Sequence, residues 1–245
     1  MIVTQLPALQ VVVPLIAAPL CLLLSRRLTV WAVAFLASAA SFFVAVLLLV
    51  RVLEEGIVSY NFGGWAAPWG IEYRVDVVNA FVLIIVTAIS TIVLFFARQS
   101  VHQEVEEKKQ PLFYSAWLLC LTGLTGIAIT GDAFNLFVFL EISSLSSYVL
   151  IAFGKDRRAL TASYQYLVMG TIGATFILIG VGLLYMMTGT LNLADLADRL
   201  PPVSATRTVQ TALAFLVVGI SLKLALFPLH LWLPNAYAFA PSAVT

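Results

Sequence analysis

Apolar runs long enough to cross a lipid bilayer follow one another along almost the whole chain. A transmembrane helix needs about 20 consecutive, mostly apolar residues. Charged residues, glycine or proline bound these runs, which predict helices over residues 7–24, 29–50, 77–97, 112–130, 133–154 and 159–188, and a last run that begins near Thr208. Charged residues make up 10% of the chain, against roughly a quarter in a soluble domain. The expected fold class is therefore an all-α polytopic membrane protein, with about seven transmembrane helices and the start of an eighth.

Glu141 is the only formally charged residue between Ala133 and Gly154. At about 1.5 Å per helical residue it lies roughly 10 Å into the hydrocarbon. A carboxylate at that depth is costly unless it is paired, hydrated or protonated, so it is a functional candidate by default. Ser144 follows one turn later and Tyr148 shares the helix face of Glu141. For Ser144, ordinary packing remains open beside a hydrogen bond to Glu141 or a bound water.

Lys223 is the one obvious counter-charge for Glu141, because no other formal charge occurs between Arg207 and Thr245. The run around it, residues 209–237, is longer than a single span needs. Two charges of opposite sign are therefore expected at membrane depth in this chain.

Two prolines predict that the helix carrying Lys223 is broken. Pro228 and Pro234 each remove a backbone donor and clash with the preceding turn, so we expect the break near residues 227–229. Interrupted helices at membrane depth mark ion and substrate sites in transporters. His230 follows within one turn; a hydrogen-bonded core histidine and a proton relay both remain open for it.

The loops predict the interfaces and the orientation. Residues 51–74 are turn-rich and favour a short hairpin at the membrane surface, with Trp65 and Trp69 in an aromatic belt. Residues 192–200 have the apolar spacing of a surface helix. The loops after the first, third and fifth helices hold eight basic residues (Arg26, Arg27, Arg98, Lys108, Lys109, Lys155, Arg157, Arg158), whereas the even-numbered loops hold four (Arg51, Arg74, Arg199, Arg207). The positive-inside rule then predicts a multi-pass protein of the plasma (inner) membrane with its N-terminus outside.

Several functions are excluded. A net charge of +1 gives no surface for nucleic acid. Neither nucleotide-binding nor redox motifs occur, so no cofactor and no hydrolytic or redox active site is expected. Cys21 and Cys120 lie in apolar runs and fit packing, with no metal-ligand spacing. Asp132 suits an N-cap of the fifth helix, although an ion entrance stays open for it.

Three stretches resemble the proton-conducting antiporter-like membrane subunits. They are GDAFNLFVFLEISSLSSYVLIAF, GTIGATFILIGVGLLYMMTGTLNLADL and SLKLALFPLHLWLPNAYAFAPSAVT, which begin at Gly131, Gly170 and Ser221. That family includes subunits of multisubunit Mrp-type sodium/proton antiporters, of respiratory complex I and of membrane-bound hydrogenases. The amino-acid sequence of these stretches is most similar to the D subunit of the Mrp type. The resemblance is strong over residues 111–245 and rests on hydropathy alone before them.

This resemblance implies a fold of fourteen helices that contains two inverted five-helix repeats, each with a broken helix. The family's acid of helix 5 falls on Glu141, its lysine of helix 7 on Lys223, and its histidine after the break on His230. In such proteins the glutamate and lysine are proposed to gate proton movement, because a nearby carboxylate favours a charged lysine and burial disfavours it. Residues 1–110 then form a three-helix segment and residues 111–245 a first channel repeat.

The family's second repeat, including the lysine or histidine of its eighth helix, has no counterpart before Thr245. We therefore expect the chain to be a fragment or a split subunit, with other membrane subunits supplying the second half. The leading hypothesis is a subunit of a cation/proton antiporter that conducts protons and is coupled to sodium export. A proton-pumping subunit of a complex I-type or hydrogenase complex, and a structural or truncated subunit without transport, are the alternatives. Whether sodium, potassium or only protons move stays open.

Overall fold

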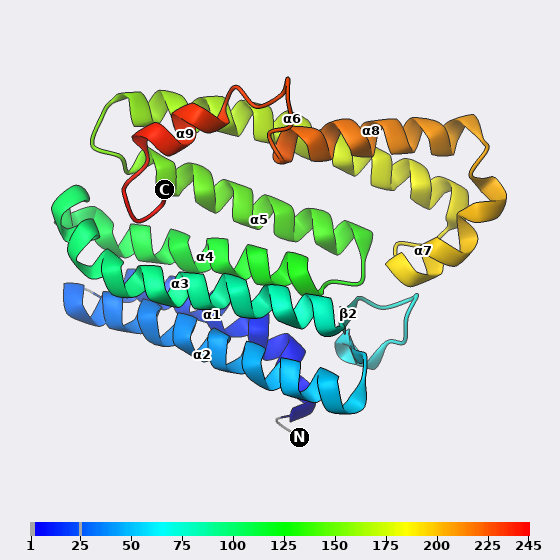
Figure 1. Ribbon diagram of the computed structural model, residues 1–245, viewed down its shortest axis with the longest axis horizontal. Coiled ribbons are helices and arrows are strands. Elements are labelled where there is room, and N and C mark those ends of the chain that lie inside the picture. The colour runs from blue at the N-terminus through cyan, green and yellow to red at the C-terminus, as the bar shows by residue number, and fades with distance from the viewer. Residues whose placement is uncertain (1–2, 25) are drawn as a thin grey trace.

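The computed structural model describes residues 3–24 and 26–245, and its long helices run roughly side by side (Figure 1). Six helices among these residues are long and apolar enough to cross a membrane. They are α1 (Leu6–Leu23), α2 (Arg27–Glu55), α3 (Val77–Glu104), α4 (Gln110–Ile129), α5 (Ala133–Ala152) and α6 (Arg158–Thr188). The first six expected spans are thus confirmed, and the protein is a multi-pass membrane protein.

Two helices continue beyond the ends expected from hydropathy. The extra turn of α2 contains Arg51, whose Nε donates to Glu55 Oε2 at 2.7 Å. In the extra turns of α3, the Ser100 hydroxyl donates to Glu104 Oε1 at 3.0 Å. Polar side chains four residues apart stabilise the last turns of a helix, so both helices extend past their apolar segments into charged sequence.

The seventh expected helix is interrupted earlier than the sequence predicted. Helix α8 (Arg207–Lys223) ends at Lys223 itself, and helix α9 (Leu233–Phe239) begins only after nine non-helical residues, 224–232. Ala225 has a φ of 52°, a conformation that L-residues rarely adopt, so the backbone leaves the helix before Pro228 is reached. In Figure 1 the break lies about midway along α5. The described residues thus contain six helices of spanning length and one interrupted helix, where seven and the start of an eighth were expected.

One end of the bundle is closed by the expected hairpin and surface helix. Strands β1 (Val58–Asn61) and β2 (Glu72–Val75) pair antiparallel, and Trp65 and Trp69 in their connection are exposed. Helix α7 (Leu193–Arg199) lies at the same end (Figure 1). Isolated bridges join Tyr73 to Thr130 and Asp132 to Asn192, so the hairpin, the α4–α5 turn and the start of α7 are linked. The described residues also form four short 3₁₀ helices: η1 (Val3–Gln5), η2 (Phe62–Gly64), η3 (Glu107–Lys109) and η4 (Pro201–Val203).

Glycines allow close contacts of α6 with α5 and α8. A Cβ on Gly219 of α8 would lie 2.6 Å from the carbonyl oxygen of Gly173 of α6. The Tyr148 hydroxyl of α5 lies against Gly170 in the same way. Gly182 is different, because a Cβ there would meet no atom within 4 Å. Close packing therefore explains most of the α6 glycines, as expected, but not Gly182.

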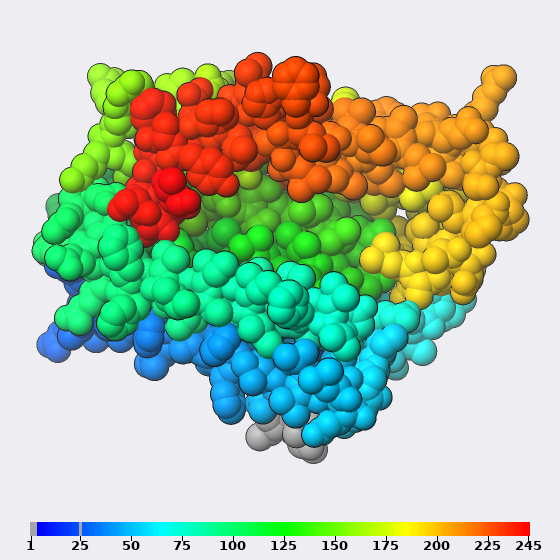
Figure 2. Space-filling model, in the orientation of Figure 1, coloured from blue at the N-terminus to red at the C-terminus, as the bar shows by residue number. Residues whose placement is uncertain are grey.

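Helices α4 and α5 lie recessed between α3 on one side and α8 and α9 on the other (Figure 2). A cavity of about 310 Å³ on α3, α4 and α5 is lined mainly by apolar side chains, together with Ser90, Trp117, Cys120 and Ser147. Trp117 Nε1 donates to the Ser90 hydroxyl at 2.9 Å. Phe113, Leu118, Leu94 and Leu48 are among the fully buried side chains of the core.

Candidate functional site

Helix α5 carries Glu141 near its middle. The helix begins where the Asp132 side chain accepts a hydrogen bond from the Asn135 backbone amide at 2.7 Å, which confirms the expected N-cap. Eight residues separate Glu141 from Ala133, so the carboxylate lies about 12 Å along the helix axis. Its side chain is 24% exposed. The acid thus lies near the middle of a capped helix that is long and apolar enough to cross a membrane.

Lys223 is the last residue of α8 and reaches Glu141. Its Nζ donates to Glu141 Oε1 at 2.9 Å, and its side chain is only 9% exposed. The helix end also favours a cation, because the last carbonyl groups of a helix carry partial negative charge. The structure therefore brings together the two charges that the sequence singled out.

Ser144 contacts the lysine rather than the glutamate. Lys223 Nζ donates to Ser144 Oγ at 2.8 Å, and no bond between Ser144 and Glu141 is seen among the described residues. The two partners of Lys223 lie three residues apart on α5, which places them on one helix face. The hydrogen bond from Ser144 to Glu141 that the sequence left open is therefore not among the contacts of the described residues, and Ser144 instead accepts from Lys223.

His230 lies within the break, where its ring packs at 5.4 Å from the Phe227 ring. Its Nδ1 is buried and has no hydrogen-bond partner within residues 3–24 and 26–245. No hydrogen bond or ion pair between described residues joins it to Glu141 or Lys223. The structure thus brings together two of the three candidate residues, and a relay role for His230 stays a prediction.

Trp232 is a residue of this site that the sequence reasoning missed. Its Nε1 donates to the Leu222 carbonyl at 3.2 Å and so satisfies one of the last carbonyls of α8. Tyr166 of α6 stacks on its ring with centroids 3.9 Å apart. Both side chains line a cavity of about 190 Å³ with Ser147 and Tyr237. In the sequence, the only sign of a role for Trp232 was its position two residues after His230. Its contacts with Leu222 and Tyr166 form only where α6, α8 and the break meet.

The end of α5 that carries Asp132 has no basic partner for this acid among the described residues. Burial raises the pKa of the Asp132 carboxyl above its ordinary 3.8, although backbone amides of Asn135 and Phe134 act in the opposite direction. Glu72 of β2 is also buried and accepts from Asn192 Nδ2 at 2.8 Å and from the Ser59 hydroxyl at 2.6 Å. Asp132 and Glu72 therefore link the hairpin, the α4–α5 turn and the start of α7, and their contacts give them a structural role.

Replacing Asp132 separates capping from charge. We expect Asp132→Ala to lower the melting temperature in detergent, because a lost N-cap costs about 1 kcal/mol. Asp132→Asn should keep the cap. A carboxyl whose pKa is raised on folding contributes stability that is lost as the pH rises through the folded pKa. Relative to Asp132→Asn, the wild type should therefore become less stable as the pH rises from 3.8. Thermal melts between pH 3.5 and 7 measure this, and equal melts of Asp132→Ala and wild type would contradict the cap.

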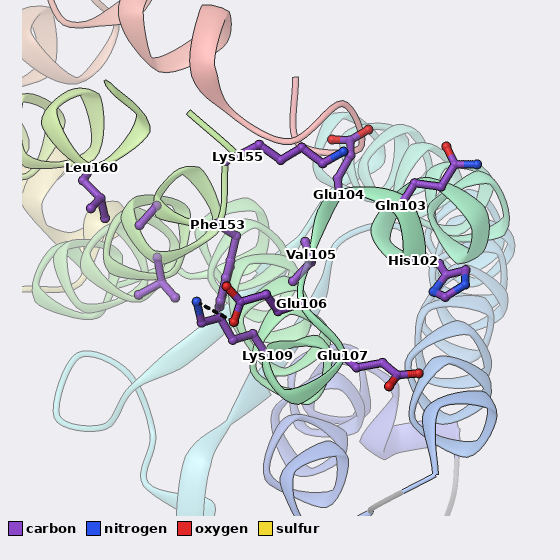
Figure 3. A pocket seen from close by; sticks show the side chains of 13 residues that line it. His102, Gln103, Glu104, Val105, Glu106, Glu107, Lys109, Phe153, Lys155 and Leu160 are labelled. Atoms are coloured by element: carbon purple, nitrogen blue, oxygen red, sulfur yellow. Dashed lines mark ion pairs between the residues drawn. The ribbon is translucent and has the colours of Figure 1, made fainter. Parts of the chain in front are cut away.

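A charged cavity of about 760 Å³ opens at the other end of α5 (Figure 3). Its polar lining includes His102, Glu104, Glu106, Glu107, Lys109 and Lys155. Lys109 Nζ pairs with Glu106 at 3.0 Å, and Glu104 accepts hydrogen bonds from the backbone amide and the hydroxyl of Ser242. Val149 is the lining residue of α5 nearest in sequence to Glu141, about 12 Å along the axis. The cavity is thus separate from the Glu141–Lys223 pair.

No group of three or more His, Cys, Asp or Glu side chains suited to a metal ion occurs among the residues that the structure describes. Cys21 is buried and Cys120 partly buried, and both are free thiols. The Cys120 sulfur lies 3.5 Å from the Ser147 hydroxyl.

Comparison with known proteins places this geometry in a family. The family model described as "NADH:quinone oxidoreductase/Mrp antiporter, TM" matches residues 130–245. The N subunit of the NADH-quinone oxidoreductase of Desulforudis audaxviator is 44% identical over 98% of this chain and 48% of its own length. The chain belongs to the NADH:quinone oxidoreductase/Mrp antiporter family. It is an antiporter-like membrane subunit.

Other members of the family agree in sequence and in fold. The D subunit of the Na(+)/H(+) antiporter of Bacillus subtilis is 31% identical over 97% of this chain and 48% of its own length. A chain of the archaeal membrane-bound sulfane sulfur reductase superposes with a TM-score of 0.90 at 35% identity, covering 98% of this chain and 49% of that one. A chain of the Mrp complex from Dietzia sp. DQ12-45-1b gives 0.87 at 28% identity, covering 100% and 45%. The chain spans about half the length of the curated relatives it matches.

Proposed function

We propose that this protein is an ion-translocating subunit of a multisubunit cation/proton antiporter. It conducts protons through Glu141 and Lys223, coupled to sodium export. The observation that carries the proposal is the 2.9 Å contact between two side chains of opposite charge at the end of a broken helix. Ion pairs at membrane depth are rare and cluster on ion pathways. The relatives named as Na(+)/H(+) antiporter subunits support the choice of an antiporter.

In the proposed mechanism, Lys223 is the proton carrier and Glu141 controls it. While the carboxylate is in contact, it favours the protonated ammonium; when the carboxylate leaves, the buried amine releases its proton more readily. Glu141 is the more exposed of the two, so it is the partner with freedom to move. His230 is proposed as the relay, supported by its place in the break and its buried, unpartnered Nδ1.

The proposed setting is a plasma membrane with the N-terminus outside, supported by the excess of basic residues in the odd-numbered loops. Residues 111–245 are proposed as a channel repeat and residues 1–110 as a separate three-helix segment. Other membrane subunits are the proposed partners, since both solved relatives are chains of multisubunit complexes.

A second candidate is a proton-pumping subunit of a redox complex. The 44% identity to the N subunit of a NADH-quinone oxidoreductase and the fold shared with a respiratory reductase favour it. The two candidates differ in what drives transport. In vesicles holding the whole complex, an antiporter moves sodium in the direction opposite to the protons when a pH gradient is imposed. A redox pump instead acidifies one side only when an electron donor is added.

The test of proton carriage is Lys223→Arg in the assembled complex. Arginine keeps the positive charge for Glu141 but effectively never releases a proton. We expect normal assembly and a loss of proton flux of about 100-fold, the lower range for losing a proton-transfer group. Flux is measured with a pH-sensitive dye in vesicles, and Lys155→Arg, in an exposed loop, is the matched control. Wild-type flux through Lys223→Arg would leave the pair with only a structural role.

A further inference from the structure

Ser144 is the second protein group that holds the Lys223 ammonium. The two contacts of Lys223 Nζ are of equal length within normal hydrogen-bond variation, 2.9 Å to Glu141 and 2.8 Å to Ser144. An ammonium group has three hydrogen-bond donors, so both bonds form at the same time. Lys223 therefore has an acidic and a neutral partner on one face of α5.

Ser144 differs in its contacts from the other serines of α5. The hydroxyls of Ser143, Ser146 and Ser147 donate to carbonyl groups of α5 itself, at Leu140, Ile142 and Ser143. Such bonds are the ordinary way in which a membrane helix satisfies a serine. Ser144 instead accepts a hydrogen bond from another helix, through the one cationic side chain of the site.

The two partners also differ in burial. Ser144 is buried, whereas Glu141 is only partly buried. Around Ser144 the backbone of α5 is tightly packed, since a Cβ on Gly123 of α4 would lie 2.5 Å from the Ser143 amide nitrogen. Ser163 of α6 also donates to the Tyr148 carbonyl at 2.7 Å. A short side chain on this fixed backbone stays in place, while the longer glutamate has room to turn away.

We propose that Ser144 is a positioning residue that keeps the Lys223 amine beside α5 when Glu141 releases it. This inference rests on the proposed role of Lys223 as proton carrier. Without the serine, a released lysine loses the second of its two hydrogen-bond partners among the described residues. With it, the amine remains within reach of the glutamate for the next cycle.

The experiment measures Lys223 directly, without requiring transport. Vesicles holding the assembled complex are treated at fixed pH with a membrane-permeant amine-acylating reagent, which reacts with the neutral amine. Mass spectrometry gives the labelling rate of Lys223 relative to the exposed Lys155 as an internal reference. Hydrogen bonds to charged groups are stronger than neutral ones, so we expect Ser144→Ala to raise the Lys223 rate by roughly ten-fold. Ser144→Thr keeps a hydroxyl, so its Lys223 labelling rate should equal that of the wild type.

Ser146→Ala is the matched control, because Ser146 is equally buried on α5 but bonds only the Ile142 carbonyl in the described residues. Its Lys223 labelling rate should equal that of the wild type. Glu141→Gln shows that the assay responds, since it removes the other partner. A wild-type rate in Ser144→Ala, with a raised rate in Glu141→Gln, would overturn the positioning role. So would equal rates in Ser144→Ala and Ser144→Thr.

Flux data on the same vesicles separate the two proposals. If Lys223→Arg conducts normally while Ser144→Ala still raises labelling, the contact is real and the proton-carrier proposal fails. If Lys223→Arg abolishes flux and Ser144→Ala changes neither labelling nor flux, proton carriage stands and the serine has no part in it.

Discussion

Replacing either Lys223 or Glu141 with alanine should abolish proton flux, with a loss of about 100-fold or more, and replacing both should not restore it. The two single changes remove the proton carrier or the group that controls it. If the pair were only a structural bridge, the double replacement would restore function, because no unpaired charge remains.

The melting temperatures of the single and double alanine variants should rank differently from their proton fluxes. Removing one partner of a buried ion pair costs roughly 3 kcal/mol or more, because it leaves an uncompensated charge. Removing both is often neutral. We therefore expect Glu141→Ala,Lys223→Ala to assemble and melt like the wild type, and each single variant to melt earlier. Dye-detected flux and melting of the purified complex give both readouts. A double variant that conducts protons would contradict the proposed mechanism.

Gly219→Ala should have the second largest effect, although it touches no charged group. The added Cβ would lie 2.6 Å from the Gly173 carbonyl oxygen and 2.8 Å from Ile177 Cγ1. Backbone atoms of α6 cannot yield as a flexible side chain does, and overpacking of this kind costs about 1–3 kcal/mol. Lys223 lies four residues beyond Gly219 on the same face of α8, so a displaced α8 carries the lysine away from Glu141. We expect both a lower melting temperature and a reduced flux.

Gly182→Ala is the matched control for this prediction. It makes the same chemical change on α6, where a Cβ would meet no atom within 4 Å. Alanine is favoured over glycine in a helix by up to about 1 kcal/mol, so its melting temperature should be unchanged or higher, with normal flux. Similar behaviour of the two variants would mean that the α6–α8 contact does not position Lys223.

The sequence predicted the membrane class and the main helices well because hydropathy is a local property. Each of the first six runs needs only its own residues to be recognised, and turn residues likewise predicted the hairpin between α2 and α3. The ends were less predictable. Helix α2 continues to Glu55 through a salt bridge, and hydropathy does not register such polar contacts.

The sequence predicted that the seventh helix is broken, but not the residue at which the break begins. Proline identifies where a helix cannot continue, but the residue at which it actually ends depends on which alternative contacts satisfy its last carbonyl groups. Here Trp232 and backbone amides of residues 224–226 do so. The helix therefore ends at Lys223, five residues before Pro228, and the charged side chain lies at a helix terminus.

By itself, the sequence predicted that Glu141 and Lys223 lie at membrane depth and that each needs a partner, since an unpaired charge in hydrocarbon is costly. It also determined the family, through residue patterns along single helices. Only the tertiary structure decided that Ser144 shares the lysine with Glu141, that Trp232 caps α8, and that His230 bonds neither charged residue. Those contacts join residues on different elements, and their geometry is set by how closely α6 and α8 approach at Gly173 and Gly219.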